Sequence, residues 1–258
     1  MNLIPISNVN LHELHIYKEL RDNAFRADNS FVADSSKVVN LILETDIEVK
    51  SIFATQAYYD EFRELIENKN IPKLYVATKE LMQTIVGHKV HHNVMLHGIR
   101  PKECELKQLD KHIVMLDNIT SSENVGSIAR SASALGINSY LLPKQSPHPF
   151  GRRALRVSMG HSSHLKIHIY EEIKETLLIL KSKGYTIYAA ETTQNALPLS
   201  KIEIKGKWVL LMGHEGHGLS TEVLALCDRV VYIEMQEHVK SFNVAVAASI
   251  IMYDFKHK

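Results

Sequence analysis

Cysteine is scarce in this sequence, and long apolar runs are absent. The two cysteines among 258 residues, Cys104 and Cys227, form no CxxC pair and no disulfide framework, which excludes a disulfide-stabilised secreted fold and favours a reducing cytoplasm. The longest apolar run, Val244 to Met252, is interrupted by Ser249 and falls short of the roughly 20 residues that a bilayer-spanning helix needs. The N-terminal segment MNLIPISNVN lacks the basic and apolar regions of a secretory signal, so we predict none.

Glycine-rich nucleotide signatures are missing as well. Gly213, Gly216 and Gly218 follow an apolar stretch, but their order is not GxGxxG and no GK[ST] sequence follows, so neither NAD binding nor NTP hydrolysis is predicted. The composition, with 45% hydrophobic and 23% charged residues, is sufficient to bury a core and excludes intrinsic disorder. A chain of this length commonly forms two domains.

The N-terminal part of the chain predicts a small α/β unit. Helices are expected over 11–26, 36–44 and 58–68 and from Lys79, and strands over 31–33, 49–53, 73–76 and 92–97. The stretch RPKECELKQLDK alternates charges and has little apolar content, which is typical of a linker. We therefore predict a first domain over 1–100, a linker over 101–111 and a second domain over 112–258.

The second domain shows the same alternation of strands and helices, with longer elements. Strands are expected over 113–116, 139–142, 165–169, 186–190, 207–212 and 230–233, with helices beginning near Asn124, Gly151, Glu171, Thr221 and Ser241. Several strands are continuous apolar runs, which indicates a mainly parallel sheet covered by helices on both faces. Ligands bind beyond the carboxyl ends of the strands in such sheets, so we expect the site in the segments after Leu116, Met212 and Ile233.

Each of these three segments has an unusual feature. A helix from Asn124, with Asn124 as its expected N-cap, places Arg130 as the one charge on a face of small residues, which indicates either a polyanion contact or a solvated arginine. Glu215 lies among the three glycines, which indicates close backbone approach or a turn with positive φ. The helix after Ser241 is apolar on nearly every side, so it is buried in its own domain or, as we favour, against a second subunit.

One stretch of the chain is strongly basic. From Lys144 to His168 there is no carboxylate, and the basic residues are Lys144, Arg152, Arg153, Arg156 and Lys166. Such a stretch indicates contact with a polyanion or a solvated loop, with about equal weight for each. Three histidines, His161, His164 and His168, have helical spacing, but the last lies in an expected strand and no cysteine or carboxylate accompanies them. We therefore predict no metal site and favour RNA contact or partial exposure for these histidines.

Together the three segments resemble the motifs of the SpoU/TrmH family of RNA ribose 2′-O-methyltransferases, in the SPOUT superfamily. The NxGxxxR pattern corresponds to Asn124, Gly126 and Arg130, and GxEGxG to Gly213, Glu215, Gly216 and Gly218. The third motif corresponds to Ile233, Met235, Ser241, Asn243 and Val244, with Glu234 for proline and Phe242 for leucine. The resemblance covers about 112–256 and includes Arg156, while segment 1–100 looks more loosely like the ribosomal-protein-like RNA-binding domain of many members.

The resemblance implies a fold, a cofactor and roles for residues. The fold would be an α/β sheet with a deep trefoil knot, acting as a homodimer through the knot and the C-terminal helix. S-adenosyl-L-methionine would be bound by Gly213, Gly218, Ile233, Met235 and Phe242. The catalytic residues would be Arg130, Asn124, Glu215, Ser241 and Asn243, and RNA would contact Lys144, Arg152, Arg153 and Arg156.

The implied roles can be weighed by their chemistry. Arg130 stays protonated in proteins, so orienting an RNA phosphate or stabilising a developing alkoxide is easier to defend than a role as base. Glu215 is expected to anchor the loops, because a base would need its pKa of about 4.3 raised considerably.

The resemblance implies methyl transfer to a ribose 2′-hydroxyl of RNA. The composition and spacing place this activity in the cytoplasm, without a metal or a membrane. An N-terminal RNA-binding domain is commoner in family members that act on rRNA, so the resemblance favours rRNA over tRNA as substrate. The alternative is a non-catalytic RNA-binding protein that keeps the fold, since Glu234, Gln236 and Glu237 add negative charge beside a cationic cofactor. The modified nucleotide and the proton acceptor are left open.

Overall fold

The chain forms two compact units. The computed structural model describes residues 1–8, 10–18, 28–86 and 93–258. The first unit comprises Met1–Lys102 and His148–Ser163, and the second comprises Glu103–Pro147 and His164–Lys258. The first unit therefore includes residues 148–163, which the sequence assigns to the second domain. One reason is the ring of Phe150, which packs edge-on against Phe31 with ring centroids 5.0 Å apart.

The first unit is built on a mixed sheet. Within the described residues this sheet has five strands in the order β1-β4-β3-β5-β2. They are β1 (Leu3–Pro5), β2 (Ser30–Asp34), β3 (Val49–Ala54), β4 (Lys73–Val76) and β5 (Val94–Ile99). β1, β3 and β4 are parallel, whereas β5 runs antiparallel to β2 and β3. The sequence pattern does not reveal β1, because a short edge strand ending in proline leaves no alternation to detect.

Short helices cover this sheet. They are α1 (His15–Lys18), α2 (Ser36–Leu43), α3 (Gln56–Glu61), α4 (Arg63–Glu67) and α5 (Lys79–Val86). The prediction of one helix over 58–68 is wrong, because the backbone leaves helical geometry at Phe62 (φ −114°, ψ 27°). Of the helix predicted over 11–26, residues 12–18 are helical and 19–26 lie outside the described residues. Tyr17 and Met82 pack with Phe53 in the core.

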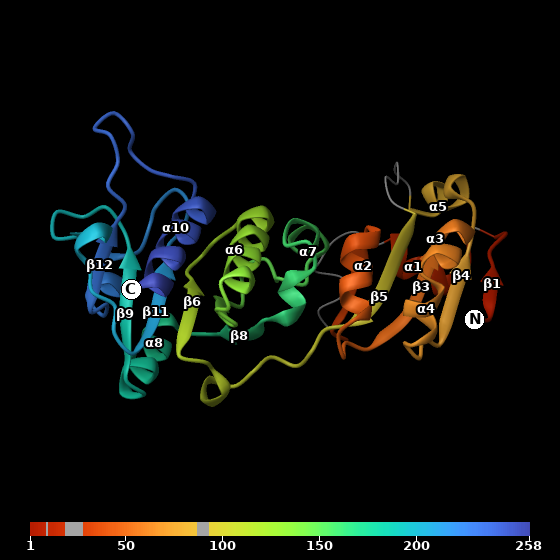
Figure 1. Cartoon of the computed structure of the whole chain (residues 1–258), viewed down its shortest axis with the longest axis horizontal. Coiled ribbons are helices and arrows are strands. Elements are labelled where there is room, and N and C mark those ends of the chain that lie inside the picture. The colour runs from red at the N-terminus through yellow and green to blue at the C-terminus, as the bar shows by residue number, and fades with distance from the viewer. Residues whose placement is uncertain (9, 19–27, 87–92) are drawn as a thin grey trace. The chain divides into compact units, whose positions relative to one another are not determined.

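The second unit is built on a parallel sheet, as predicted. Its described strands lie in the order β10-β12-β9-β11-β6-β7-β8, and every pairing between them is parallel. They are β6 (His112–Leu116), β7 (Ser139–Pro143), β8 (Lys166–Tyr170), β9 (Tyr185–Ala190), β10 (Leu197–Pro198), β11 (Lys207–Met212) and β12 (Arg229–Tyr232). The chain runs outward from β6 to β8 and then builds the other half, so the strand order reverses between β6 and β11 (Figure 1).

Helices cover both faces of this parallel sheet. They are α6 (Ser122–Ala134), α8 (Ile173–Ser182), α9 (Thr221–Leu224) and α10 (Val244–His257), while α7 (Arg152–Val157) belongs to the first unit. α8 and α9 cover one face, where Leu177 and Val223 join a core cluster with Val209. α6 and α10 pack together on the other, where Phe255 meets Trp208 edge-on at 5.3 Å. The α/β class is confirmed, and the knot stays a prediction.

No described helix combines the length and apolar character that a membrane crossing needs.

Candidate active site

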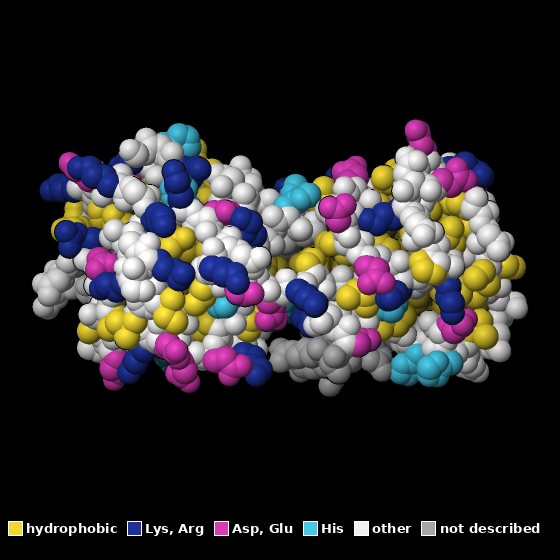
Figure 2. Space-filling model, turned by 90° about the horizontal axis from the view of Figure 1, so that it is seen from below, with side chains coloured by type: hydrophobic (Ala, Val, Ile, Leu, Met, Phe, Trp, Pro, Cys, Tyr) yellow, Lys and Arg dark blue, Asp and Glu magenta, His cyan; other side chains and the backbone are white. Residues whose placement is uncertain are grey.

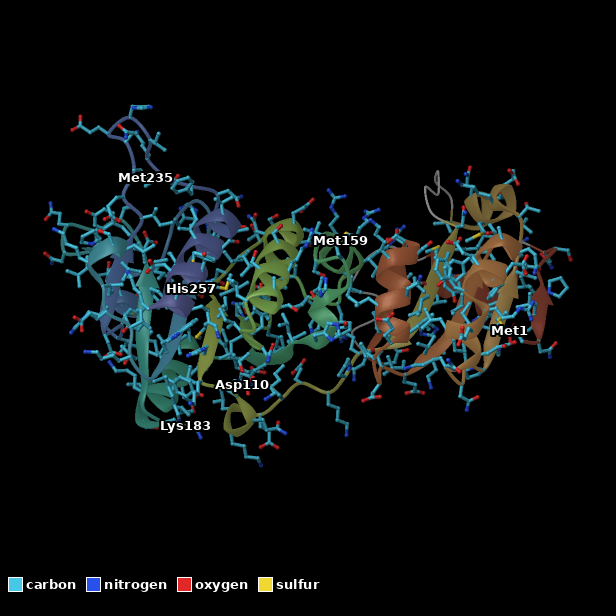
Figure 3. All side chains as sticks on the ribbon, in the orientation of Figure 1. Met1, Asp110, Met159, Lys183, Met235 and His257 are labelled. Atoms are coloured by element: carbon cyan, nitrogen blue, oxygen red, sulfur yellow. The ribbon has the colours of Figure 1, made fainter. Side chains whose placement is uncertain are left out.

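A cavity of about 370 Å³ lies at the carboxyl ends of β9, β11 and β12. Its lining includes residues 213–218 of the loop after β11 (213–220, the glycine loop), part of the segment between β12 and α10 (233–243, the β12–α10 loop) and part of α10. Every residue predicted to hold the cofactor lines it: Gly213, Gly218, Ile233, Met235 and Phe242. Figure 3 labels Met235 at this edge of the second unit and Lys183 at the opposite edge. The cavity thus occupies the edge where open parallel sheets bind ligands.

A chain of hydrogen bonds joins three loops at this edge. Glu215 Oε1 accepts from Asn124 Nδ2 at 2.9 Å, and Asn124 Oδ1 accepts from Asn243 Nδ2 at 3.0 Å. The backbone N–H groups of Thr120 and Ser121 also donate to the Glu215 carboxylate, both at 3.3 Å. The structure therefore brings together three of the predicted catalytic residues, from the segments after β6, β11 and β12. They meet beside the reversal of strand order.

The start of α6 orients Asn124. The prediction that Asn124 caps this helix is wrong: the N-cap is Ser121, whose Oγ accepts from the Asn124 N–H at 3.3 Å. Several residues in this segment can act as caps, so the sequence does not decide between them. Because Asn124 lies within the first turn, its side-chain amide is available to bridge Glu215 and Asn243.

The start of α10 orients Asn243. The helix begins at Val244 rather than near Ser241, and Asn243 Oδ1 accepts from the N–H groups of Ala245 at 2.9 Å and Val246 at 3.3 Å. The same side chain donates to Asn124 through Nδ2. The Asn243 amide therefore uses both of its polar ends: its oxygen caps α10, and its nitrogen binds Asn124 at the start of α6. Ser241 is exposed and lines the cavity.

Two glycines meet different requirements in the glycine loop. A Cβ at Gly213 would lie 2.7 Å from the carbonyl carbon of Gly218 and 2.8 Å from the backbone N of Leu219, so the backbone approaches itself too closely for a side chain. Gly218 has φ +66°, and a Cβ there would overlap Oε1 of Glu191. Both explanations that the sequence left open, close approach and positive φ, are therefore present at separate positions.

The environment of Glu215 opposes a role as base. Burial alone would raise its pKa, but the hydrogen bonds from Asn124 and from the backbone of Thr120 and Ser121 lower it, and the net shift of the pKa is downward. A general base that works near neutral pH needs the opposite shift. The carboxylate instead acts as the acceptor that ties the glycine loop to the start of α6.

Arg130 lies apart from this network. Its side chain is exposed on α6, does not line the cavity, and has no hydrogen bond or ion pair within the described part of the chain. Its neighbour Ser131 accepts a hydrogen bond from Ser249 Oγ of α10 at 2.7 Å. The predicted face of small residues is therefore partly covered by α10, which leaves the guanidinium at the surface beside it.

Glu234 directs its charge away from the cavity. Its carboxylate accepts from the Ser200 hydroxyl and from the Ser200 backbone N–H, the latter at 3.4 Å. The hydroxyl bond is the main cause of the lowered pKa of Glu234. Neither Glu234 nor its neighbours Gln236 and Glu237 line the 370 Å³ cavity. The replacement of proline thus fastens the start of the β12–α10 loop.

The two histidines of the glycine loop line the cavity. His214 Nδ1 lies 2.9 Å from the N–H of Gly216 and 3.2 Å from the N–H of His217, so this nitrogen must be the acceptor and the proton lies on Nε2. The His217 ring stacks on that of His214 with centroids 4.8 Å apart. Neutral His214 therefore helps to shape the loop.

Several residues of the basic stretch form ion pairs with carboxylates that lie outside it in the sequence. Arg152 binds Asp34 of the first unit through Nε at 2.9 Å, and Arg156 lies 3.6 Å from the same carboxylate. The other pairs are Lys144 with Glu171 and Lys166 with Asp110, while Arg153 is exposed. Figure 2, which views the strand-start edge of the second unit, likewise shows basic and acidic side chains interspersed. RNA contact by Lys144, Arg152, Arg153 and Arg156 stays a prediction.

The histidine-rich stretch is divided between two elements. His161 and His164 lie in a 3-10 helix, whereas His168 lies in β8 with Nδ1 2.7 Å from the carbonyl oxygen of Cys104. Helical spacing therefore does not hold across the three. Among residues that the structure describes, no group of His, Cys, Asp and Glu is arranged to hold a metal ion.

Sequence reasoning missed two acidic residues at this edge. Glu191 follows β9, lines the cavity, and accepts from the N–H of Leu219 through Oε1 at 2.8 Å. Asp117 follows β6, is buried, and accepts from the Asn118 side chain at 3.0 Å. Burial raises the pKa of Asp117. The only signal for either was its position directly after an apolar strand.

A protein-family model matches more than half of the chain. Residues 111–253 match the model of the SpoU rRNA Methylase family. A protein of Mycobacterium bovis named as an uncharacterized tRNA/rRNA methyltransferase is 28% identical over 86% of this chain and 79% of its own. A 23S rRNA (guanosine-2′-O-)-methyltransferase, RlmB, of Acinetobacter baylyi is 27% identical over 69% of this chain and 75% of its own.

Solved structures share the fold over nearly the whole chain. An AdoMet-bound rRNA methyltransferase from Sinorhizobium meliloti superposes with a TM-score of 0.84 at 20% identity, covering 99% of this chain and 98% of that one. The SpoU methyltransferase AviRb from Streptomyces viridochromogenes, in complex with AdoMet, gives 0.83 at 20% identity over 96% of this chain and 98% of its own.

Proposed function

The chain belongs to the SpoU rRNA methylase family, and from this premise we propose that it transfers the methyl group of S-adenosylmethionine to a ribose 2′-hydroxyl of ribosomal RNA. The observation that carries the proposal is the hydrogen-bonded chain Glu215–Asn124–Asn243 beside a cavity at the ends of the parallel strands. The similarity to a 23S rRNA (guanosine-2′-O-)-methyltransferase supports a ribose hydroxyl of rRNA as the acceptor.

The cavity residues fit such a cofactor. A volume of about 370 Å³ is within the range of small-molecule sites. Ile233 and Phe242 supply apolar surface for a purine, and Gly213 presents backbone polar groups without a side chain. When bound, S-adenosylmethionine supplies an activated methyl group on a sulfonium sulfur.

The protein must then align the ribose oxygen with the methyl group and stabilise the charge that develops on the oxygen. The ribose oxygen must be held in line with the methyl carbon, and its proton must leave as the new bond forms. Arg130 is charged at every working pH, so it orients an RNA phosphate or stabilises the oxygen as negative charge develops. Asn124 and Asn243 keep the three loops in register, and Glu215 is the anchor of that arrangement.

The proposal includes a homodimer acting in the cytoplasm. α10 buries Ala248, Ile251 and Phe255, yet its opposite face exposes Val246 and Tyr253, the latter by 59%. An exposed apolar face on a helix is typical of a subunit contact. Light scattering of the purified chain should give twice the monomer mass.

Mapping ribose methylation tests the activity. Deletion of the gene should remove one or more 2′-O-methyl marks from rRNA, and the wild-type gene should restore them. Arg130→Ala should fail to restore them, with a transfer rate at least about 100-fold lower, because the charge that positions the RNA is lost. Its affinity for S-adenosylmethionine in calorimetry should stay within about twofold. If the lost marks lie in tRNA, tRNA replaces rRNA as the substrate. An unchanged methylation map would favour an RNA-binding protein without catalysis.

A further inference from the structure

Glu191 is a carboxylate of the cavity to which neither the motifs nor the network assigns a role. We propose that Glu191 recognises the vicinal hydroxyl groups of the ribose of a nucleoside cofactor, and so determines which nucleosides the cavity accepts. This inference rests on the proposed function, because it presumes that the cavity holds such a cofactor.

One oxygen of Glu191 is fixed by the glycine loop. Oε1 accepts from the Leu219 N–H at 2.8 Å and lies where a side chain at residue 218 would otherwise be. Gly218 combines φ +66° with the absence of a Cβ, so the carboxylate fits directly against the loop backbone. The side chain is thereby held in one orientation beside the cavity.

The other oxygen of Glu191 remains an open acceptor. Oε2 has no hydrogen-bond partner within the described ranges, although Glu191 lines the cavity. The second carboxylate of the lining, Glu215, already accepts from Thr120, Ser121 and Asn124. Glu191 is therefore the carboxylate left to receive hydrogen bonds from a ligand. Neighbouring hydroxyl groups of a ribose are donors that a carboxylate accepts well.

The order of the strands favours the ribose over the amino-acid tail. β9, which ends at Glu191, lies between β12 and β11. The apolar lining residues Ile233 and Phe242 follow β12, whereas Glu215 follows β11 and its partner Asn124 follows β6. In the cofactor, the ribose likewise lies between the purine and the sulfonium group. Matching the two orders places the ribose at Glu191.

The variant Glu191→Gln tests this role with minimal disturbance. Its amide oxygen can still accept from the Leu219 N–H, which leaves the NH₂ group toward the cavity and turns an acceptor into a donor. The affinities for S-adenosylhomocysteine and for 5′-methylthioadenosine, which has the ribose but no amino-acid tail, should both fall about 10- to 100-fold in calorimetry. The melting temperature without ligand should not change. Glu222→Gln, an exposed charge outside the cavity lining, is the matched control and should bind as the wild type does.

Four results would overturn the proposal. Unchanged affinity for both ligands removes the role, and a loss confined to S-adenosylhomocysteine assigns the carboxylate to the ammonium group instead. If wild-type protein binds neither ligand, the proposed function fails with it. Should the variant not fold, the wild type alone decides: the 2′,3′-dideoxy analogue of 5′-methylthioadenosine must bind about 10-fold or more weakly than the parent, and equal binding refutes the inference.

Discussion

The glycine loop and the β12–α10 loop line one cavity, yet they are held in different ways. In the glycine loop, His214 receives two backbone N–H groups, Glu191 receives that of Leu219, and Glu215 joins the start of α6. The β12–α10 loop is fastened near its start by Glu234 and at its end by Asn243, while residues 236–242 between them are exposed. The first loop is therefore suited to precise positioning, and the second to adaptable covering of the proposed cofactor.

The largest effect is expected from Gly218→Ala in the glycine loop. An alanine at φ +66° costs about 1–3 kcal/mol, and its Cβ would displace the Glu191 carboxylate. A shift of this size near the ligand should weaken binding of S-adenosylmethionine about 100-fold or more, as measured by calorimetry. Gly216→Ala is the matched control, because its Cβ would meet His214 Cε1 at an ordinary 3.5 Å. Equal losses in the two variants would show that the loop is not rigid at Gly218.

Much of this arrangement could be predicted from sequence, for an identifiable reason. The strands of the parallel sheet are buried on both faces, so they read as apolar runs, and Lys207–Met212 matches its expected range. Because such sheets bind ligands beyond the carboxyl ends of their strands, the pattern also predicted the site in the segments after Leu116, Met212 and Ile233. Helix starts were less accurate, because Ser121 and Asn124, or Ser241 and Asn243, can all act as caps.

The contacts between distant segments could not be predicted. Arg152 finds Asp34 at a separation of 118 residues, although no carboxylate lies near it in the sequence. Glu191 and Gly218 likewise meet only because β9 and β11 are neighbours in the sheet. Local periodicity indicates which residues are buried. It does not indicate which polar residues from distant segments become neighbours when the sheet forms.

A smaller effect is expected where the two loops connect, at Asn243. Asn243→Asp keeps an oxygen to cap α10 but removes the donor to Asn124 and sets two acceptors against each other. The rate of methyl transfer should fall about 10-fold, as a lost hydrogen bond implies, while the melting temperature changes little. Asn243→Ala, which loses the cap as well, should also destabilise the protein by about 1 kcal/mol. If both variants lost only stability, the link would be structural.

The start of the β12–α10 loop should tolerate change better. Glu234→Gln weakens an exposed contact with Ser200, so affinity for S-adenosylmethionine should fall only about twofold to threefold. Ser200→Ala should reproduce this loss, and the double variant should be no worse than either single one. Glu237→Gln, an exposed residue of the same loop, is the control for charge alone. A loss comparable to that of Gly218→Ala would show that the β12–α10 loop is as rigid as its neighbour.

The smallest effect is the dependence of the glycine loop on pH through Glu215. The pKa of this carboxyl lies below its ordinary 4.5 in the folded protein, so its contribution to stability is constant above pH 4.5 and is lost as the pH falls through the lowered value. The difference in unfolding free energy between wild type and Glu215→Gln, measured with urea, should therefore be flat from about pH 5 to 8. It should shrink below about pH 4. A difference that changes between pH 5 and 8 would mean that a group other than Glu215 controls how firmly the loop is held.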